Sequence, residues 1–287
     1  MGHATEFHTA DGLTLRGEAW GDATNPPALL LHGGGQTRHA WSGTAQALAT
    51  EGYYAIALDQ RGHGDSDWHP EGHYAFDVYA RDVQDVVRQI GRAPVLIGAS
   101  LGGIASLLAC YHGEENVGTG LVLVDIATQM ERGGIARIFE FMRGAPDGFA
   151  TLDEAAEAVA AYQPHRQRPP DTRGLEKNLR RGEDGRWRWH WDPRFIEHRG
   201  PHVVDDPTRR TLLDDAARDL RIPTLLVRGR MSDVLSEEGA QAFLDLVPHA
   251  QLADITNAGH MVAGDRNDVF TEAVLNFLRG RQRADAG

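Results

Sequence analysis

Consecutive apolar residues form short runs along the chain, and each run ends in a polar or glycine-rich loop. These runs lie within residues 27–31, 54–58, 95–97, 120–124 and 222–228. Apolar residues at consecutive rather than alternate positions are typical of strands that are buried on both faces of a sheet. Segments with apolar side chains at helical spacing, such as 79–90, separate the runs. This alternation predicts an α/β fold built on a parallel sheet.

Both ends of the chain extend this pattern. Residues 6–10 and 13–20 flank the dipeptide Asp11-Gly12, which is typical of tight hairpin turns, so an antiparallel pair of strands is expected to open the fold. Towards the other end, residues 251–255 are expected to form the last strand. An amphipathic helix should follow and end near Gly280, where a frayed tail is expected to begin.

The alternation of strands and glycine-rich loops stops in the middle of the chain. Segments of helical character with many Arg, Asp and Pro residues replace it, at 135–142, 152–161, 175–181 and 208–220. We therefore expect an inserted helical cap over residues 127–216, between the two parts of a core domain at 1–126 and 217–287.

Three tryptophans stand at alternate positions of the expected cap, in the sequence WRWHWDP. In an extended conformation Trp187, Trp189 and Trp191 would share one face. The rings either line a pocket for an apolar acyl group or fix the cap to the core, and both interpretations stay open. Trp189 and Trp191 are therefore candidate substrate-binding residues.

Composition argues against several classes of function. The formal net charge of −12 argues against nucleic acid or an anionic membrane as a partner, because either would require a basic surface. The one cysteine, Cys110, allows neither a disulfide framework nor a thiolate metal cluster. We find no secretory signal pattern and no run of about 18 apolar residues that could span a bilayer, so a cytoplasmic location is expected.

The most informative motif is GASLGG, which begins at Gly98. A short apolar strand runs into it, and a helix-favouring segment follows at once. A serine at the apex of such a sharp turn, here Ser100, is held in a strained conformation that exposes its hydroxyl. The turn needs glycine two residues to either side, and Gly98 and Gly102 supply it. This pattern is that of a nucleophile elbow, although alone it also fits a plain turn between a strand and a helix.

Three consecutive glycines, Gly33, Gly34 and Gly35, follow His32. Their backbone N–H groups are unshielded, which suits a loop that binds a developing oxyanion. We expect one donor from Gly34 or Gly35 and a second from Leu101, the residue after the serine. A merely flexible loop is the alternative interpretation.

The loop DQRGHGDS contains Asp59, Arg61, His63 and Asp65, a set of side chains that invites a metal-site interpretation. The same residues fit hydrogen bonding within a tight, glycine-containing loop at least as well. We therefore expect a structural role for this loop.

Four polar side chains stand just beyond predicted strands: Ser100, Asp125, Asp233 and His260. Because the carboxyl ends of parallel strands share one edge of a sheet, these side chains can converge. A serine hydroxyl is a weak nucleophile that needs a base within hydrogen-bond reach and a third group to orient the base. The order Ser, Asp, His matches the chain order that accompanies the nucleophile elbow.

Together, the segments LLLHGGG, DQRGHGDS, GASLGG, GRMSD and NAGH resemble those of the α/β-hydrolase superfamily, and in particular its capped bacterial esterases, cofactor-free haloperoxidases and carbon–carbon bond hydrolases. The resemblance covers roughly residues 5–126 and 218–280. It implies a mostly parallel eight-stranded sheet with helices on both faces and an inserted helical cap.

The resemblance also implies the site: Ser100 as nucleophile, His260 as base, Asp233 as acid, and oxyanion donors from the backbone around Gly34 and from Leu101. Asp125, directly after the strand at 120–124, is the second candidate acid. We favour Asp233 because the interval between it and His260 leaves room for one helix and one strand. Asp125 would then line the pocket or the hinge of the cap.

The expected activity is hydrolysis of a carboxylic ester or related acyl compound through an acyl-enzyme, with a small-molecule substrate and without a metal or cofactor. Alternatives on the same triad are hydrolysis of a carbon–carbon bond and perhydrolysis with peroxide. A non-catalytic small-molecule receptor is a further alternative, although a binder has no need of an activated serine. Formation of a homodimer is left open.

Overall fold

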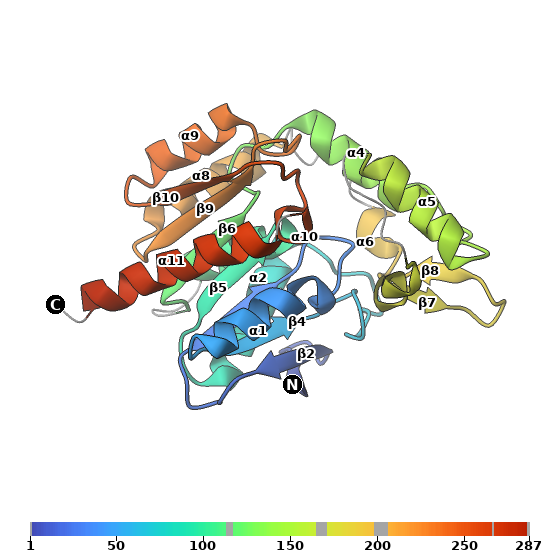
Figure 1. Ribbon diagram of the computed structural model, residues 1–287, viewed down its shortest axis with the longest axis horizontal. Coiled ribbons are helices and arrows are strands. Elements are labelled where there is room, and N and C mark those ends of the chain that lie inside the picture. Colours follow the sequence, from blue (N-terminus) through green and yellow to red (C-terminus); the bar gives the residue numbers. More distant parts are fainter. Residues whose placement is uncertain (1, 113–116, 165–170, 198–205, 266, 286–287) are drawn as a thin grey trace.

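A mixed sheet of eight strands forms the centre of the structure (Figure 1). The structure, a computed structural model, describes all residues except 1, 113–116, 165–170, 198–205, 266 and 286–287. The strands of the sheet are β1 (His3–His8), β2 (Thr14–Trp20), β3 (Pro27–Leu31), β4 (Tyr54–Leu58), β5 (Val95–Ala99), β6 (Gly120–Val124), β9 (Thr224–Gly229) and β10 (Gln251–Ile255). Their order in space is β1-β2-β4-β3-β5-β6-β9-β10. The mostly parallel eight-stranded sheet that the sequence predicted is thus confirmed.

Antiparallel pairing is confined to the first strands of the sheet. β1 pairs with β2 in antiparallel fashion, β2 does so with β4, and Gly12 takes a φ of +89° in the turn of the hairpin. The predicted hairpin around Asp11-Gly12 is therefore confirmed. From β4 to β10 all neighbouring strands are parallel. Their carboxyl ends consequently lie along one edge.

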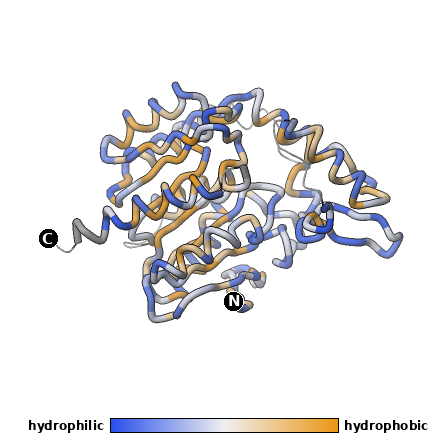
Figure 2. The backbone as a smooth tube through the Cα atoms, in the orientation of Figure 1, coloured by the Kyte–Doolittle hydropathy of each residue, from blue (hydrophilic) through white to orange (hydrophobic). Residues whose placement is uncertain are grey.

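Successive residues of the central strands face two different layers of helices, which explains the consecutive apolar runs. In β3, Leu29 and Leu31 belong to one buried cluster and Leu30 to another. The first cluster includes residues of α2 (Phe76–Ile90), α3 (Leu101–His112), α8 (Pro207–Asp219) and α9 (Glu237–Leu246), and the second includes residues of α1 (Ser42–Thr50) and α11 (Asn267–Asp285). Figure 2 shows the strands as hydrophobic stretches at the centre of the molecule.

The last helix is longer than the sequence suggested. α11 continues to Asp285, so the expectation of a frayed tail from Gly280 is wrong for the residues that the structure describes. An amphipathic pattern that fades does not end a helix, because polar residues can extend it into solvent. Among the described helices, including this one, none is long and apolar enough to cross a membrane.

The middle of the chain forms a separate group of elements beside the carboxyl edge of the sheet (Figure 1). It contains α4 (Arg132–Arg143), α5 (Leu152–Tyr162), a 3-10 helix η2 (Arg173–Asn178), the antiparallel strands β7 (Leu179–Arg181) and β8 (Trp187–Trp189), and the short helix α6 (Arg194–Glu197). The helical expectation for residues 175–181 is only partly met, since this stretch includes a strand. We call the elements from α4 to α6 the cap.

Helix α8 packs on the sheet domain. It lies against α3 and α9, and its residues Leu213, Ala216 and Ala217 are buried in the first core cluster. The cap that was expected over residues 127–216 therefore includes a helix that the structure places on the sheet. The spacing of apolar residues shows which face of a helix is apolar, but it does not show whether the sheet domain or the cap covers that face.

Candidate active site

Ser100 occupies a sharp turn between β5 and α3. Its backbone φ is +46°, in the left-handed region that non-glycine residues rarely adopt. A Cβ atom at Gly98 would collide with the carbonyl oxygen of Gly102, and one at Gly102 would collide with that of Leu31. Because the obstructing atoms belong to the backbone, only glycine fits at both positions. The predicted turn thus has the geometry of a nucleophile elbow.

Asp125 is the carboxylate that the structure brings to His260. It directly follows β6, has a φ of +51°, and is fully buried. Its Oδ2 lies 2.8 Å from Nδ1 of His260, which stands in the loop after β10. A carboxylate only accepts hydrogen bonds, so Nδ1 carries the proton and Nε2 of His260 is left as the acceptor. This is the tautomer that a general base requires.

Two further donors fix the same carboxylate. The backbone N–H of Gly229 donates to Oδ1 of Asp125 at 2.9 Å, and the hydroxyl of Ser232 donates to Oδ2 at 2.5 Å. Sequence reasoning missed both residues. The available signal was the serine within GRMSD, which follows the strand that pairs with β6.

The expectation that Asp233 contacts His260 is wrong. Its carboxylate, with a side chain 36% exposed, forms an ion pair with Arg137 of α4. The backbone carbonyl of Asp233 also packs on Gly134, where no Cβ would fit. The chain after β9 turns so that Ser232 faces β6 while its neighbour faces the cap. Asp125, for which a place in the pocket wall or the cap hinge was expected, holds the position beside the base.

The glycine loop after β3 provides one unpaired N–H group, not several. The N–H of Gly33 donates to Oε1 of Gln36 and that of Gly35 to Nε2 of His63, each at 3.1 Å. Gly34 has no acceptor for its N–H within the described ranges, and the same holds for Leu101 at the start of α3. Gly35, the alternative to Gly34 as the donor from this loop, therefore already has an acceptor, and Gly34 and Leu101 remain as candidate donors.

Two buried histidines support this loop from behind. His32 accepts the N–H of Gln60 at Nε2 (3.0 Å), while its Nδ1 lies 2.8 Å from the carbonyl oxygen of Gly33. This pair of contacts requires the neutral ring with the proton on Nδ1. Burial lowers the pKa of His32, in agreement with a neutral ring. His63 repeats the arrangement between the N–H of Gly35 and the carbonyl of Arg61.

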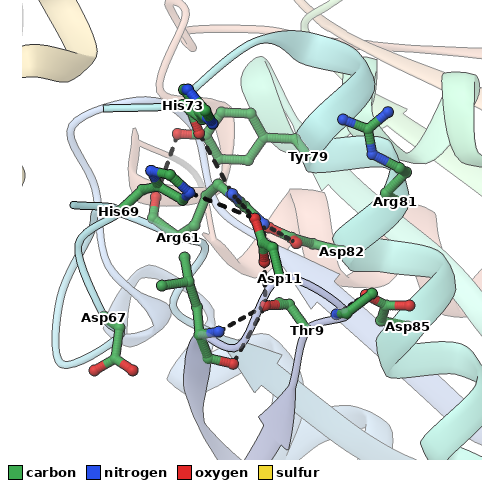
Figure 3. Close-up of polar contacts among 12 residues, drawn as sticks. Thr9, Asp11, Arg61, Asp67, His69, His73, Tyr79, Arg81, Asp82 and Asp85 are labelled. Carbon is green, nitrogen blue, oxygen red and sulfur yellow. Dashed lines mark hydrogen bonds and ion pairs between the residues drawn. The ribbon is translucent and has the colours of Figure 1, made fainter. Parts of the chain in front are cut away.

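The loop DQRGHGDS, for which a metal site was one interpretation, is stabilised by ion pairs. Figure 3 shows Arg61 between two carboxylates; its guanidinium lies 2.5 Å from Asp82 and 2.9 Å from Asp11. Although burial opposes the shift, hydrogen bonds from Arg61 and Thr9 lower the pKa of Asp11 to about 2. No cluster of side chains suited to a metal ion is found in the part of the chain that the structure describes.

The same loop also anchors the cap. The N–H of Gly64 donates to the carbonyl of His190 at 2.7 Å, and the N–H of Asp192 donates to the carbonyl of Gly62 at 2.8 Å. These bonds flank Trp191 and place its ring over the site. The structural role expected for this loop therefore includes positioning part of the cap.

A cavity of about 370 Å³ opens above the elbow and is lined by both Ser100 and His260. Most of its wall is apolar, and α4 contributes much of it through Ile135, Ile138, Phe139, Phe141 and Met142. Neither Asp nor Glu is found among the described lining residues. The lining also includes the cationic side chains of Lys177 and Arg209. A wall of this kind suits a largely apolar group that carries no positive charge.

Two of the three tryptophans line this cavity. The rings of Trp189 and Trp191 are stacked, with centroids 5.2 Å apart and planes inclined by 9°. Trp187 is not among the lining residues; it pairs with Phe149 through its backbone and packs, together with Trp189, against the small cap cluster around Phe149. Of the three tryptophans expected on one face, Trp189 and Trp191 are the two that reach the cavity.

Comparisons with known proteins show the family to which the chain belongs. A family model described as "Alpha/beta hydrolase family" matches residues 28–273. An esterase of Mycobacterium tuberculosis is 29% identical over 276 residues, which are 91% of this chain and 85% of that protein. An sn-1-specific diacylglycerol lipase of Mus musculus is 27% identical over 270 residues, 90% of this chain and 82% of the lipase.

Solved structures share the fold. The crystal structure of E-2-(acetamidomethylene)succinate hydrolase matches with a TM-score of 0.83 at 23% identity, over 97% of this chain and all of that one (100%). At this identity the likeness concerns the fold alone. The family model, in contrast, spans most of the sequence, from β3 to α11. This protein is accordingly an enzyme of the alpha/beta hydrolase family.

Proposed function

We propose that this enzyme hydrolyses a carboxylic ester through an acyl-enzyme, with Ser100 as nucleophile, His260 as general base and Asp125 as the acid that orients the base. One observation carries the proposal. The strained serine and the His260–Asp125 pair meet at one cavity, beside backbone N–H groups that lack acceptors among the described residues.

In the proposed reaction, Nε2 of His260 takes the hydroxyl proton of Ser100 as the oxygen attacks the ester carbonyl carbon. The N–H groups of Gly34 and Leu101 donate to the oxyanion, and each such donor is worth on the order of 3 kcal/mol. Ionised Asp125 stabilises the imidazolium that forms. The alcohol leaves with the proton from His260, and the acyl group stays on the serine.

Water completes the cycle. His260 removes a proton from a water molecule as the water attacks the acyl carbon, and the acid product leaves when the bond to Ser100 breaks. Every proton in this route passes through His260. No step uses a metal ion or an organic cofactor.

The cavity supports a substrate with a sizeable apolar group. Its wall is formed by aliphatic and aromatic side chains, among them the stacked pair Trp189 and Trp191. The named activities of two relatives, an esterase and a diacylglycerol lipase, support ester chemistry.

A fluorophosphonate probe tests the nucleophile. We expect it to label Ser100 alone, and we expect Ser100→Ala to abolish labelling and to reduce hydrolysis of p-nitrophenyl esters by about 10⁴-fold or more. Peptide mapping locates the adduct, and circular dichroism confirms that the variant is folded. An adduct on another residue, or turnover by Ser100→Ala, would contradict the proposal. Turnover of vinylogous diketones without ester hydrolysis would favour the carbon–carbon alternative.

A matched pair of tryptophan variants tests the substrate class. Trp189→Ala enlarges the apolar wall of the cavity, so the kcat/KM ratio between long and short p-nitrophenyl esters should change by about 10-fold, as for a change of one or two methylene contacts. Trp187→Ala is the control, since this ring does not line the cavity. An equal change of the ratio in both variants would mean that the rings act only through cap stability.

A further inference from the structure

We propose that Ser232 is a positioning residue of the active site: its hydroxyl holds the Asp125 carboxylate in the orientation that His260 needs. The inference rests on the proposed function, in which Asp125 orients the general base. It assigns a role to a residue that neither contacts the cavity nor belongs to the expected triad.

The direction of the Ser232 hydrogen bond follows from its other contacts. Oγ of Ser232 accepts the backbone N–H of Val234 at 3.1 Å and that of Leu235 at 3.2 Å. A hydroxyl has two lone pairs and one proton. With both lone pairs engaged, the proton is directed at Oδ2 of Asp125, 2.5 Å away. Ser232 is therefore committed as a donor to the carboxylate.

This bond fixes a torsion that is otherwise soft. Rotation of an Asp carboxylate about its last side-chain bond has broad, shallow minima. Gly229 holds Oδ1 of Asp125, while Oδ2 receives both Ser232 and Nδ1 of His260. Without the serine, Oδ2 would be held only by the ring that it is meant to orient. The three donors form a set that suits an ionised carboxylate.

Sheet register places Ser232 where it can act on a neighbouring strand. The N–H of Asp125 donates to the carbonyl of Val227 in β9 at 2.7 Å, and a turn closed by the N–H of Ser232 on the carbonyl of Gly229, at 2.9 Å, brings the hydroxyl over the end of β6. The turn is closed by a backbone hydrogen bond, which sets the position of the hydroxyl relative to β6.

The charged groups around this arrangement come from three sides. His260 faces the carboxylate from the loop after β10, and the ion pair of Asp233 with Arg137 of α4 stands next along the chain. On the side of β9 and β10, Arg228 pairs with Asp254 at 2.8 Å. Arg230 also pairs with Asp254, at 3.4 Å. Of these groups, Asp125 is the one in hydrogen-bond contact with the imidazole.

Ser232→Ala tests the proposal through kcat, KM and the pH profile of kcat/KM for a p-nitrophenyl ester. We expect kcat to fall by about 10-fold with KM within about 2-fold, because a hydrogen bond to a charged group that acts in the transition state is lost. The acidic limb of the profile should move to higher pH, since Oδ2 then interacts with the imidazolium alone and His260 retains its proton longer.

Two further variants separate positioning from loop stability. Ser232→Thr keeps the hydroxyl and should restore both kcat and the pH limb. Ser236→Ala, in the same loop, removes the N-cap bond to the N–H of Gly239 and should lower the melting temperature without moving the limb. If Ser232→Ala does not fold, Ser232→Cys, with a weaker donor, should show the same shifts at reduced size.

The proposal is overturned if the alanine or cysteine variant keeps the wild-type pH limb and kcat, or if its effects match those of Ser236→Ala. Failure of the proposed function looks different: Ser100→Ala or Asp125→Asn would then retain turnover, whatever the Ser232 variants do. The two sets of measurements therefore fail separately.

Discussion

The loops after β6 and β9 make an instructive comparison. Both follow apolar parallel strands that are neighbours in the sheet, and both carry an aspartate near the catalytic edge. Asp125 is fully buried and receives three donors, whereas Asp233 is partly exposed and pairs with an arginine of the cap. The first aspartate contacts His260, the proposed base. The second ties α4 to the sheet domain.

The difference teaches that strand ends are not equivalent. Asp125 follows its strand without an intervening residue, and the left-handed backbone at that point turns its side chain across the edge. Asp233 stands at the far side of a turn, and its neighbour Ser232 takes the inward position. Distance along the chain from the histidine therefore says little about which carboxylate reaches it.

The largest expected effect comes from changing each aspartate to its amide. Asp125→Asn should lower kcat for a p-nitrophenyl ester by about 10⁴-fold, because an amide at this position favours the wrong imidazole tautomer, as it does in serine proteases. Asp233→Asn should leave kcat within about 3-fold, since its carboxylate does not contact the base. Steady-state kinetics on folded variants decide the matter. A collapse of kcat in Asp233→Asn alone would reverse the assignment.

A pair of adjacent glycines in α4 tests the anchoring role of the β9 loop. Gly134→Ala places a Cβ against the carbonyl of Asp233, and such overpacking should cost about 1–3 kcal/mol of unfolding free energy. Gly133→Ala meets no atom within 4 Å and should stabilise the helix by about 0.5–1 kcal/mol. Urea denaturation measures both. Equal effects of the two changes would mean that α4 does not rest on this loop.

The smallest expected effect is on the pH dependence of stability, which must be known when the aspartate variants are compared at a given pH. It comes from His32, which supports the glycine loop after β3. The folded protein holds His32 neutral with a lowered pKa, while the unfolded chain protonates it near pH 6.5, so the unfolded state binds more protons at acidic pH. Stability should therefore fall as the pH drops below about 6.5, by up to about 1.4 kcal/mol per pH unit for this one proton.

His32→Gln isolates that contribution, since the amide oxygen can still accept from Gln60 but does not titrate. Urea midpoints measured between pH 8 and pH 5 should fall less steeply for the variant than for the wild type. The other histidines contribute equally to both proteins and cancel in the difference. Parallel pH profiles would show that His32 is not the source.

Much of the sheet, and the sharp turn that carries Ser100, could be predicted from the sequence. Buried strands give consecutive apolar residues, and the steric need for glycine at positions 98 and 102 marks the elbow around Ser100. The three glycines after β3 predicted exposed backbone donors, and the N–H of Gly34 is the one of the three that has no acceptor among the described residues. These features are local, so a short stretch of sequence contains their physical cause.

The rest depends on contacts between distant segments. Whether Asp125 or Asp233 reaches His260 is decided by how the β9 turn packs against β6 and α4. The donor of Gly35 is taken by His63, 28 positions away, which no local pattern reveals. The placement of α8 on the sheet domain also depends on distant contacts, because its apolar face could pack against either the sheet domain or the cap.

The packing of Gly134 on the β9 loop limits how new specificities can be engineered into this scaffold. The cap carries the side chains that would select a substrate, so cap exchange between homologues is an obvious route to altered preference. However, the first turns of α4 rest on the same short turn that presents Ser232 to Asp125. A chimera that takes a foreign α4 without its matching β9 turn would shift the carboxylate that steers the base. The graft should therefore include the segment of the homologue that corresponds to residues 229–235, while α8 is kept from the original protein.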